Sequence, residues 1–270
     1  MSAGLALISH SYRRVRVLVL GAATLLVGFQ ILLCLAAKTA QELNAFGQLS
    51  ALIPEFVRQL MGPALISLMS FGGIVCLGYF HFAVVVILIG MGITITTEIS
   101  AEIETRFVDL ILSRPLARHW LITRSIVLFI AASAFLLLAM ILGTSLGLHL
   151  FAPADVFSPT LRLVRSLALN LGALIVCWGS VTLAITSFAR RRSVAGAISG
   201  LLALATYLFD YIAQIWKPAA KIAPLFPFHY YNALQLISAS GLPWREVRVL
   251  LCFAGAGIAL AYLQFTRRDL

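Results

Sequence analysis

Long uninterrupted runs of apolar residues alternate with short polar segments along most of the chain. A helix needs about 20 apolar residues to cross about 30 Å of hydrocarbon. Six runs approach or exceed this length, and we expect a transmembrane helix in each: 17–37, 73–97, 125–151, 166–188, 194–215 and 249–265. No alternating pattern typical of membrane barrel strands occurs. The pattern predicts an all-α integral membrane protein with a single transmembrane domain over residues 1–270.

The second run belongs to an uncharged stretch, 59–97, that is too long for one crossing. Pro63 and the pair Gly72-Gly73 disfavour a continuous helix, so we expect a break there. We therefore start the second span at the glycine pair and predict a short helix over 52–69, near the outer interface.

Composition agrees with a membrane domain. Hydrophobic residues make up 61% of the chain and charged residues 11%, whereas soluble domains average about 25% charged residues. A soluble globule could not cover so much apolar surface. The first run follows Arg13, Arg14 and Arg16, an order that signal peptides share. It exceeds the usual signal core of about 7–15 residues, so we expect an uncleaved first span.

The formal net charge of +10 has two interpretations. Nucleic-acid binding needs basic residues gathered on one soluble face, but these flank the apolar runs, so we expect no nucleic-acid partner. Lys and Arg are about twice as dense in the segments that share a side with the N-terminus, namely 98–124, 190–192 and the C-terminal tail. The positive-inside rule then predicts that both termini are cytoplasmic.

Small residues inside the spans predict packing rather than chemistry. Two pairs with GxxxG spacing are candidate helix-packing faces: Gly143 with Gly147, and Gly196 with Gly200. The cysteines lie in apolar runs without CxxC partners and are expected to be small buried hydrophobes: Cys34, Cys76, Cys177 and Cys252. No catalytic triad or HExxH motif appears, so we expect no catalytic residues and no metal site.

One polar segment, 97–119, has a helical pattern of its own. Apolar residues recur at three- and four-residue spacing, as on one face of an amphipathic helix: Ile99, Ile103, Phe107, Leu110 and Ile111. Charged residues lie largely off that face: Glu102, Glu104, Arg106 and Asp109. Pro115 should end this helix. The segment is either an ordinary interfacial helix or a docking site whose charged face meets a soluble partner.

The letters EIETRFVDLILSRPLAR within this segment resemble the coupling-helix region of type-2 permeases of ABC (ATP-binding-cassette) exporters. The matching positions are the acidic pair, a following acid, a Leu-rich turn and a Pro-x-x-Arg step: Glu102, Glu104, Asp109, 110–112, Pro115 and Arg118. Arg106 and Phe107 stand where that family usually has Gly-Thr. Weaker similarities are FPFHYY at 226–231 and the tail FTRRDL.

The resemblance implies a permease subunit in a bacterial inner membrane, with a second permease copy or homologue and two copies of a separate ATPase. ATP and Mg²⁺ would bind that ATPase, and this chain itself would need no cofactor. The implied coupling residues are Glu102, Glu104, Arg106, Asp109, Arg114, Pro115 and Arg118. The chain lacks the GxxxxGK[ST] loop that cradles nucleotide phosphates. The family also has re-entrant helices before the last span, whereas the residues alone allow a plain interfacial loop at 217–248.

Ionisable or amide groups inside spans are functional candidates: His81, Arg165, Asn170 and Asp210. Each also has a structural interpretation. An Asp210–Arg165 pair would join two helices, while His81 and Asn170 would bond neighbouring helices. A substrate-binding or gating role is the alternative for all four.

Two other function classes remain open. A secondary transporter would show matching broken helices in its two halves, and a membrane-embedded enzyme or assembly factor would gather polar residues at one depth. The mostly apolar spans favour a lipid-like or amphipathic cargo for a transporter.

Overall fold

The computed structural model describes residues 3–44, 47, 70–106, 119–153, 158–232, 236–237 and 241–267. This part of the chain is helical and contains no strand. Its main helices are α1 (Ala3–Glu42), α4 (Phe71–Leu77), α5 (Phe82–Thr96), α6 (Glu98–Glu104), α8 (His119–Phe151), α9 (Leu161–Phe188), α10 (Arg192–Ala213) and α13 (Trp244–Arg267). Six segments are long and apolar enough to cross a membrane, with α4, α5 and α6 together forming one of them. The all-α prediction with six spans is confirmed. The helix predicted over 52–69 lies outside the described residues.

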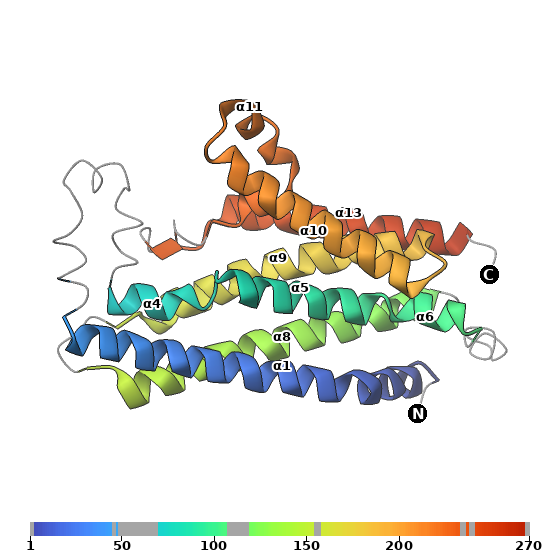
Figure 1. The fold of residues 1–270 in the computed structure, drawn as a ribbon. Coiled ribbons are helices and arrows are strands. Elements are labelled where there is room, and N and C mark those ends of the chain that lie inside the picture. Colours follow the sequence, from blue (N-terminus) through green and yellow to red (C-terminus); the bar gives the residue numbers. More distant parts are fainter. Residues whose placement is uncertain are drawn as a thin grey trace.

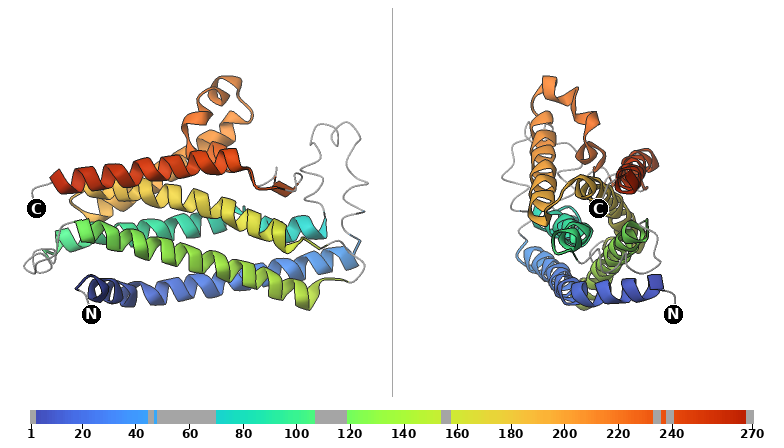
Figure 2. Two further views of the ribbon diagram at one scale, coloured as in Figure 1. Left: turned by 180° about the vertical axis from the view of Figure 1, so that it is seen from behind. Right: turned by 90° about the vertical axis from the view of Figure 1, so that its right-hand side faces the viewer.

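The six spans run roughly side by side in an elongated bundle (Figure 1). The helices α1 and α8 pack along each other on one side, and α13 packs along α9 on the other. Between these pairs, α5 contacts α8, α9 and α10. Both termini, α6 and the start of α10 lie at one end of the bundle, which we call the termini end (Figures 1 and 2).

Glycines permit the closest helix approaches. A Cβ at Gly143 of α8 would lie 3.0 Å from the Val27 Cα, so the predicted packing face on this span is confirmed. Gly257 of α13 approaches the α9 backbone equally closely, since its Cβ would lie 2.9 Å from the Ser180 carbonyl carbon. By contrast, a Cβ at Gly200 of α10 would meet nothing within 4 Å. The face predicted at Gly196 and Gly200 therefore makes no close helix packing within the described chain.

The second span begins at Phe71 with Ser70 as its N-cap, two residues before the predicted start at Gly73. The sequence did not predict a further interruption inside the span, where the chain unwinds between Gly78 and His81. A Cβ at Gly78 would collide with the buried Gln30 amide, and this tight packing explains the choice of glycine. The Tyr231 hydroxyl donates a 2.6 Å hydrogen bond to the Tyr79 carbonyl, so one backbone group freed by the break has a partner.

The segment after α10 folds back on the bundle instead of leaving it. It forms three short turns, α11 (Lys217–Ala220), η1 (Ala223–Leu225) and η2 (Pro227–Tyr230). The last of these packs against α9, α10 and α13. Phe228 is buried there, with its ring 5.6 Å from Trp178 and 5.3 Å from Tyr207, centroid to centroid.

Candidate functional site

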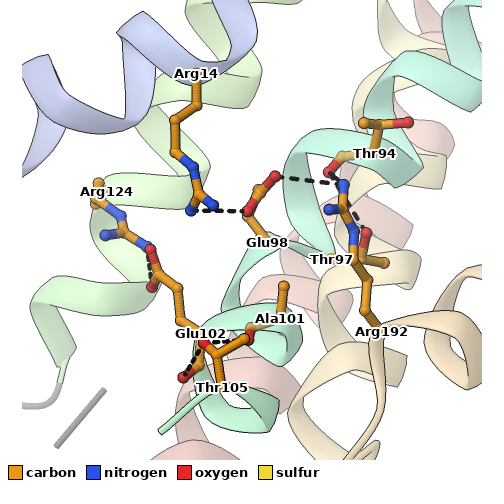
Figure 3. A network of polar contacts seen from close by, with 9 residues as sticks. All are labelled: Arg14, Thr94, Thr97, Glu98, Ala101, Glu102, Thr105, Arg124 and Arg192. Atoms are coloured by element: carbon orange, nitrogen blue, oxygen red, sulfur yellow. Dashed lines mark hydrogen bonds and ion pairs between the residues drawn. The ribbon is translucent and has the colours of Figure 1, made fainter. Parts of the chain in front are cut away.

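Charged residues from four helices meet at the termini end, in a group that we call the α6 cluster; Figure 3 shows all of its members except Glu104. It consists of three carboxylates of α6 and one arginine each from α1, α8 and α10: Glu98, Glu102, Glu104, Arg14, Arg124 and Arg192. The short helix α6 continues α5 after a bend at Thr97, so its position is fixed by the second span. All members of the cluster lie where spans begin or end.

The innermost contact is an ion pair between Glu102 and Arg124. Arg124 Nη2 lies 2.6 Å from Glu102 Oε2, and both side chains are almost fully buried. A buried pair contributes less than its short distance suggests, because both charges have lost water. Removing one partner is nevertheless costly, at about 3–5 kcal/mol, because the other charge stays buried and uncompensated. The pair therefore fixes α6 to α8.

Glu98 connects two further helices to α6. One carboxylate oxygen lies 3.6 Å from Arg14 Nη1 of α1, and the other lies 3.3 Å from Arg192 Nη2 of α10. The same Arg192 nitrogen donates to the Thr94 carbonyl at 3.4 Å. Glu98 is only 17% exposed, so solvent screens these pairs less than pairs on an open surface.

Glu104 caps α10 from a different helix. Its Oε2 accepts a 3.2 Å hydrogen bond from the backbone N–H of Arg192, the first residue of α10. The residue at the N-cap position, Arg191, supplies no side-chain cap. A carboxylate suits this position because the first amides of a helix are unpaired and carry partial positive charge.

Two predictions for this region are wrong. Glu102 does not lie on an exposed charged face, because Arg124 from the next span neutralises it inside the bundle. The helix also ends at Glu104 and not at Pro115, since Arg106 has a φ of 56° and cannot continue a right-handed helix. Glu104 and Arg106 are exposed as expected. The remaining predicted coupling residues lie outside the described residues: Asp109, Arg114, Pro115 and Arg118.

A second polar group lies at the opposite end, in a cleft of about 490 Å³ that we call the Asp210 cleft. Its lining residues come from the break in span two, the end of α10 and the segment after it: Phe80, Tyr207, Asp210, Gln214, Phe228, His229, Tyr231 and Asn232. Asp210 Oδ1 lies 3.6 Å from His229 Nδ1, and Gln214 also hydrogen-bonds the carboxylate. The predicted Asp210–Arg165 pair is wrong, because the segment after α10 supplies the partner of Asp210. Desolvation raises the pKa of the Tyr231 phenol, which stays protonated and donates to Tyr79.

No family model and no curated protein matches this chain. The two polar groups are therefore the features of the molecule from which a function can be inferred. Within the described residues, no three His, Cys, Asp or Glu side chains gather as a metal site would require.

The other candidates from the sequence are dispersed. His81 caps α5, accepting a 3.3 Å hydrogen bond from the Ala83 N–H at Nδ1, and its ring lies 5.4 Å from that of Phe29 on α1. Asn170 is fully buried in α9, and its amide has no hydrogen-bond partner within the described residues. Arg165 is exposed on α9. None of these three residues lines the Asp210 cleft, although His81 directly follows Phe80, which does.

The sequence pattern did not predict two arginines of the α6 cluster, Arg14 and Arg192, or the pairing role of a third, Arg124. Under alternating crossings, all three fall at the same end as the acidic residues after span two. Matching opposite charges by predicted membrane depth would have signalled the cluster. His229, in the FPFHYY letters, was likewise not named as a partner for Asp210.

Proposed function

We propose that this chain is the permease subunit of an ATP-driven ABC exporter, and that its termini end faces the cytoplasm and a separate ATPase. The observation that carries the proposal is the α6 cluster. A helix of seven residues makes ion pairs or hydrogen bonds with three other spans, through Arg14, Arg124 and Arg192. Displacement of α6 by a partner would therefore act on α1, α8 and α10 together.

A partner can shift a conformational equilibrium only through contacts that differ between two states. The exposed end of α6, at Glu104 and Arg106, and residues 107–118 would supply those contacts. The buried pair Glu102–Arg124 would transmit the displacement, because it makes α6 and α8 move as one unit. The spans would then alternate between inward- and outward-facing arrangements or open a lateral path. The returning segment α11–η2 would lie in the outer leaflet as a re-entrant element.

The proposal is tested by docking variants of the full-length chain. We would express it with the ATPase encoded beside its gene and measure co-purification and ATP turnover. Arg106→Glu combined with Asp109→Lys should reduce both co-purification and ATP turnover, because this double variant reverses two charges of the proposed docking segment. Glu42→Lys, an exposed carboxylate at the far end of α1, is the matched control. Equal complex formation and turnover in both variants would overturn the docking role.

Sidedness is a separate test. Single cysteines would replace Arg106 and Lys217 in a chain whose four native cysteines are changed to Ala. An impermeant maleimide should label the cysteine at 217 in intact cells, and the cysteine at 106 only after the membrane is opened. The reverse labelling pattern would contradict the proposal.

The break in span two is a feature that secondary transporters share. Such a transporter would need a matching break in its other half, whereas α10 is continuous from Arg192 to Ala213. Among the described residues, the Asp210 cleft is lined by no Ser or Cys, so it lacks the nucleophile of a serine or cysteine hydrolase.

A further inference from the structure

An apolar groove of about 380 Å³ runs between α5 and α10. Its walls are aliphatic and aromatic side chains of both helices, and a glycine on each side keeps it open, Gly90 on α5 and Gly200 on α10. A Cβ at either glycine would meet nothing within 4 Å. On α5 the lining extends from Phe82 to Ile93, which corresponds to about 16 Å of helix. The groove has the length and polarity for an alkyl chain.

This groove adjoins the Asp210 cleft. Tyr207 and Phe228 line both, with their rings 5.3 Å apart in an edge-to-face arrangement. The two spaces are therefore neighbours that share part of their walls, one apolar along the helices and the other polar at the end away from the termini. Asp210 lies in the last turn of α10, where a headgroup would reach the membrane interface. The polarity of the combined site matches an amphiphile.

The polar end has the chemistry of a cation site. It offers one carboxylate, Asp210, and four aromatic rings, Phe80, Tyr207, Phe228 and Tyr231. Among the described residues that line it, none is Lys or Arg. Aromatic faces attract ammonium groups through their quadrupole, and quaternary ammonium ligands are bound in this way. A carboxylate can accept up to about four hydrogen bonds, so the contacts with His229 and Gln214 leave Asp210 able to accept a cationic partner.

We propose that the α5–α10 groove and the Asp210 cleft bind an amphiphile with a cationic, ammonium-type headgroup. The headgroup lies against Asp210 and the aromatic rings, and the alkyl chain lies between α5 and α10. The claim that this amphiphile is exported rests on the proposed function. The claim that it binds here does not, because neither the groove nor the cleft includes a residue of the α6 cluster.

The headgroup is tested with the purified full-length chain in nanodiscs, without any ATPase. The probe is a fluorescent long-chain alkyl-trimethylammonium, and an alkyl sulfate of the same chain length is the competitor. Asp210→Asn should weaken binding of the probe about tenfold. Glu246→Gln, which removes a carboxylate at the same end of the bundle but outside the cleft, should leave binding unchanged. Equal affinities for the two variants, or equally effective competition by the sulfate, would overturn the proposal.

The alkyl site is tested by filling the groove. Gly200→Phe should abolish probe binding, and Gly255→Phe is the matched control because its Cβ also meets nothing within 4 Å and it lies on α13, outside the groove. Oligomeric state is measured for both variants. Unchanged binding in Gly200→Phe would overturn the proposal. The proposal would also be overturned if Gly200→Phe abolished a dimer but still bound the probe. That result would identify a second copy of this chain as the occupant of the groove. These binding measurements use no ATPase, so they would stand even if the proposed coupling to an ATPase were disproved. The two proposals can therefore be contradicted independently.

Discussion

The consecutive helices α9 and α10 are attached to the bundle in opposite ways. In the most apolar window of α9, 72% of residues are buried, against 22% in that of α10. The helix α9 packs along α5, α8 and α13 over its length. By contrast, α10 buries only a narrow stripe of small side chains, Ala195, Ser199, Ala203 and Thr206. Its ends are also held, by Glu98 and Glu104 of α6 at one end and by the ring pair Phe209–Phe226 at the other. Its middle borders the open groove.

This difference separates the framework of the bundle from its adaptable part. Helix packing in lipid depends on close contact rather than on exclusion of water. Displacing a helix with few close contacts along its length therefore costs little free energy. The helix α10 meets this condition and also borders both the groove and the Asp210 cleft. We therefore expect α9 variants to affect folding and α10 variants to affect binding.

The largest effect is expected for Trp178→Ala on α9. This side chain is fully buried and packs against Phe228, so its loss leaves a cavity that should cost about 3–5 kcal/mol. The midpoint of thermal unfolding in detergent measures the loss. Leu201→Ala on α10 removes a side chain that is 67% exposed and should cost under about 0.5 kcal/mol. Similar losses for both would contradict the contrast between the helices.

Glu102→Leu should be next, at about 3 kcal/mol, because it leaves Arg124 buried without its partner. The double variant Glu102→Leu with Arg124→Met removes both charges and should recover most of that loss. Chemical unfolding of the four proteins in one detergent would complete a double-mutant cycle. If the loss of unfolding free energy in the double variant equals the sum of the losses in the two single variants, Glu102 and Arg124 are not energetically coupled.

Gly257→Ala should cost about 1–3 kcal/mol, because the new methyl group would be forced against the α9 backbone at Ser180. Gly200→Ala on α10 makes the same chemical change in open space and should be neutral or slightly stabilising. Thermal unfolding of these variants compares the two helices at matched chemistry. Equal destabilisation would show that α10 is covered by another chain in the assembled protein.

The smallest effect is expected for Glu104→Ala, which removes the cap of α10 and should cost about 1 kcal/mol. Its effect should be local, so hydrogen exchange at the first turn of α10 is the more sensitive measurement. Glu42→Ala, which breaks only an exposed pair with Lys38, should cost about 0.5 kcal/mol or less. Unchanged exchange in Glu104→Ala would exclude the capping role.

The spans were predictable from sequence because lipid imposes one strong requirement on length and polarity. The start of span two was predicted within two residues, but the interruption after Gly78 was not predicted. What selects Gly78 is its packing on Gln30 and a hydrogen bond from Tyr231, a residue 152 positions from Tyr79. No window of sequence contains that information.

The candidate site was predicted only in part, because contacts between residues far apart in the sequence also determine it. Asp210 was recognisable as an ionisable group at the end of a span, but its partner His229 follows the turns of α11 and η1. Glu102 was assigned to the exposed face because helical periodicity treats every charge as polar. Its true position depends on Arg124, which arrives from a different helix.

Glu98 is a single carboxylate with two arginine partners on different helices. If either α1 or α10 swings away, this carboxylate keeps one cation, so neither departure strands a lone negative charge. Separating α6 from α8 would leave both Glu102 and Arg124 without an ionic partner, because within the described chain each pairs only with the other. Because α1 packs along α8 over much of its length, the easier hinge line of the bundle runs beside α10, while α6, α8 and α1 move as a rigid block.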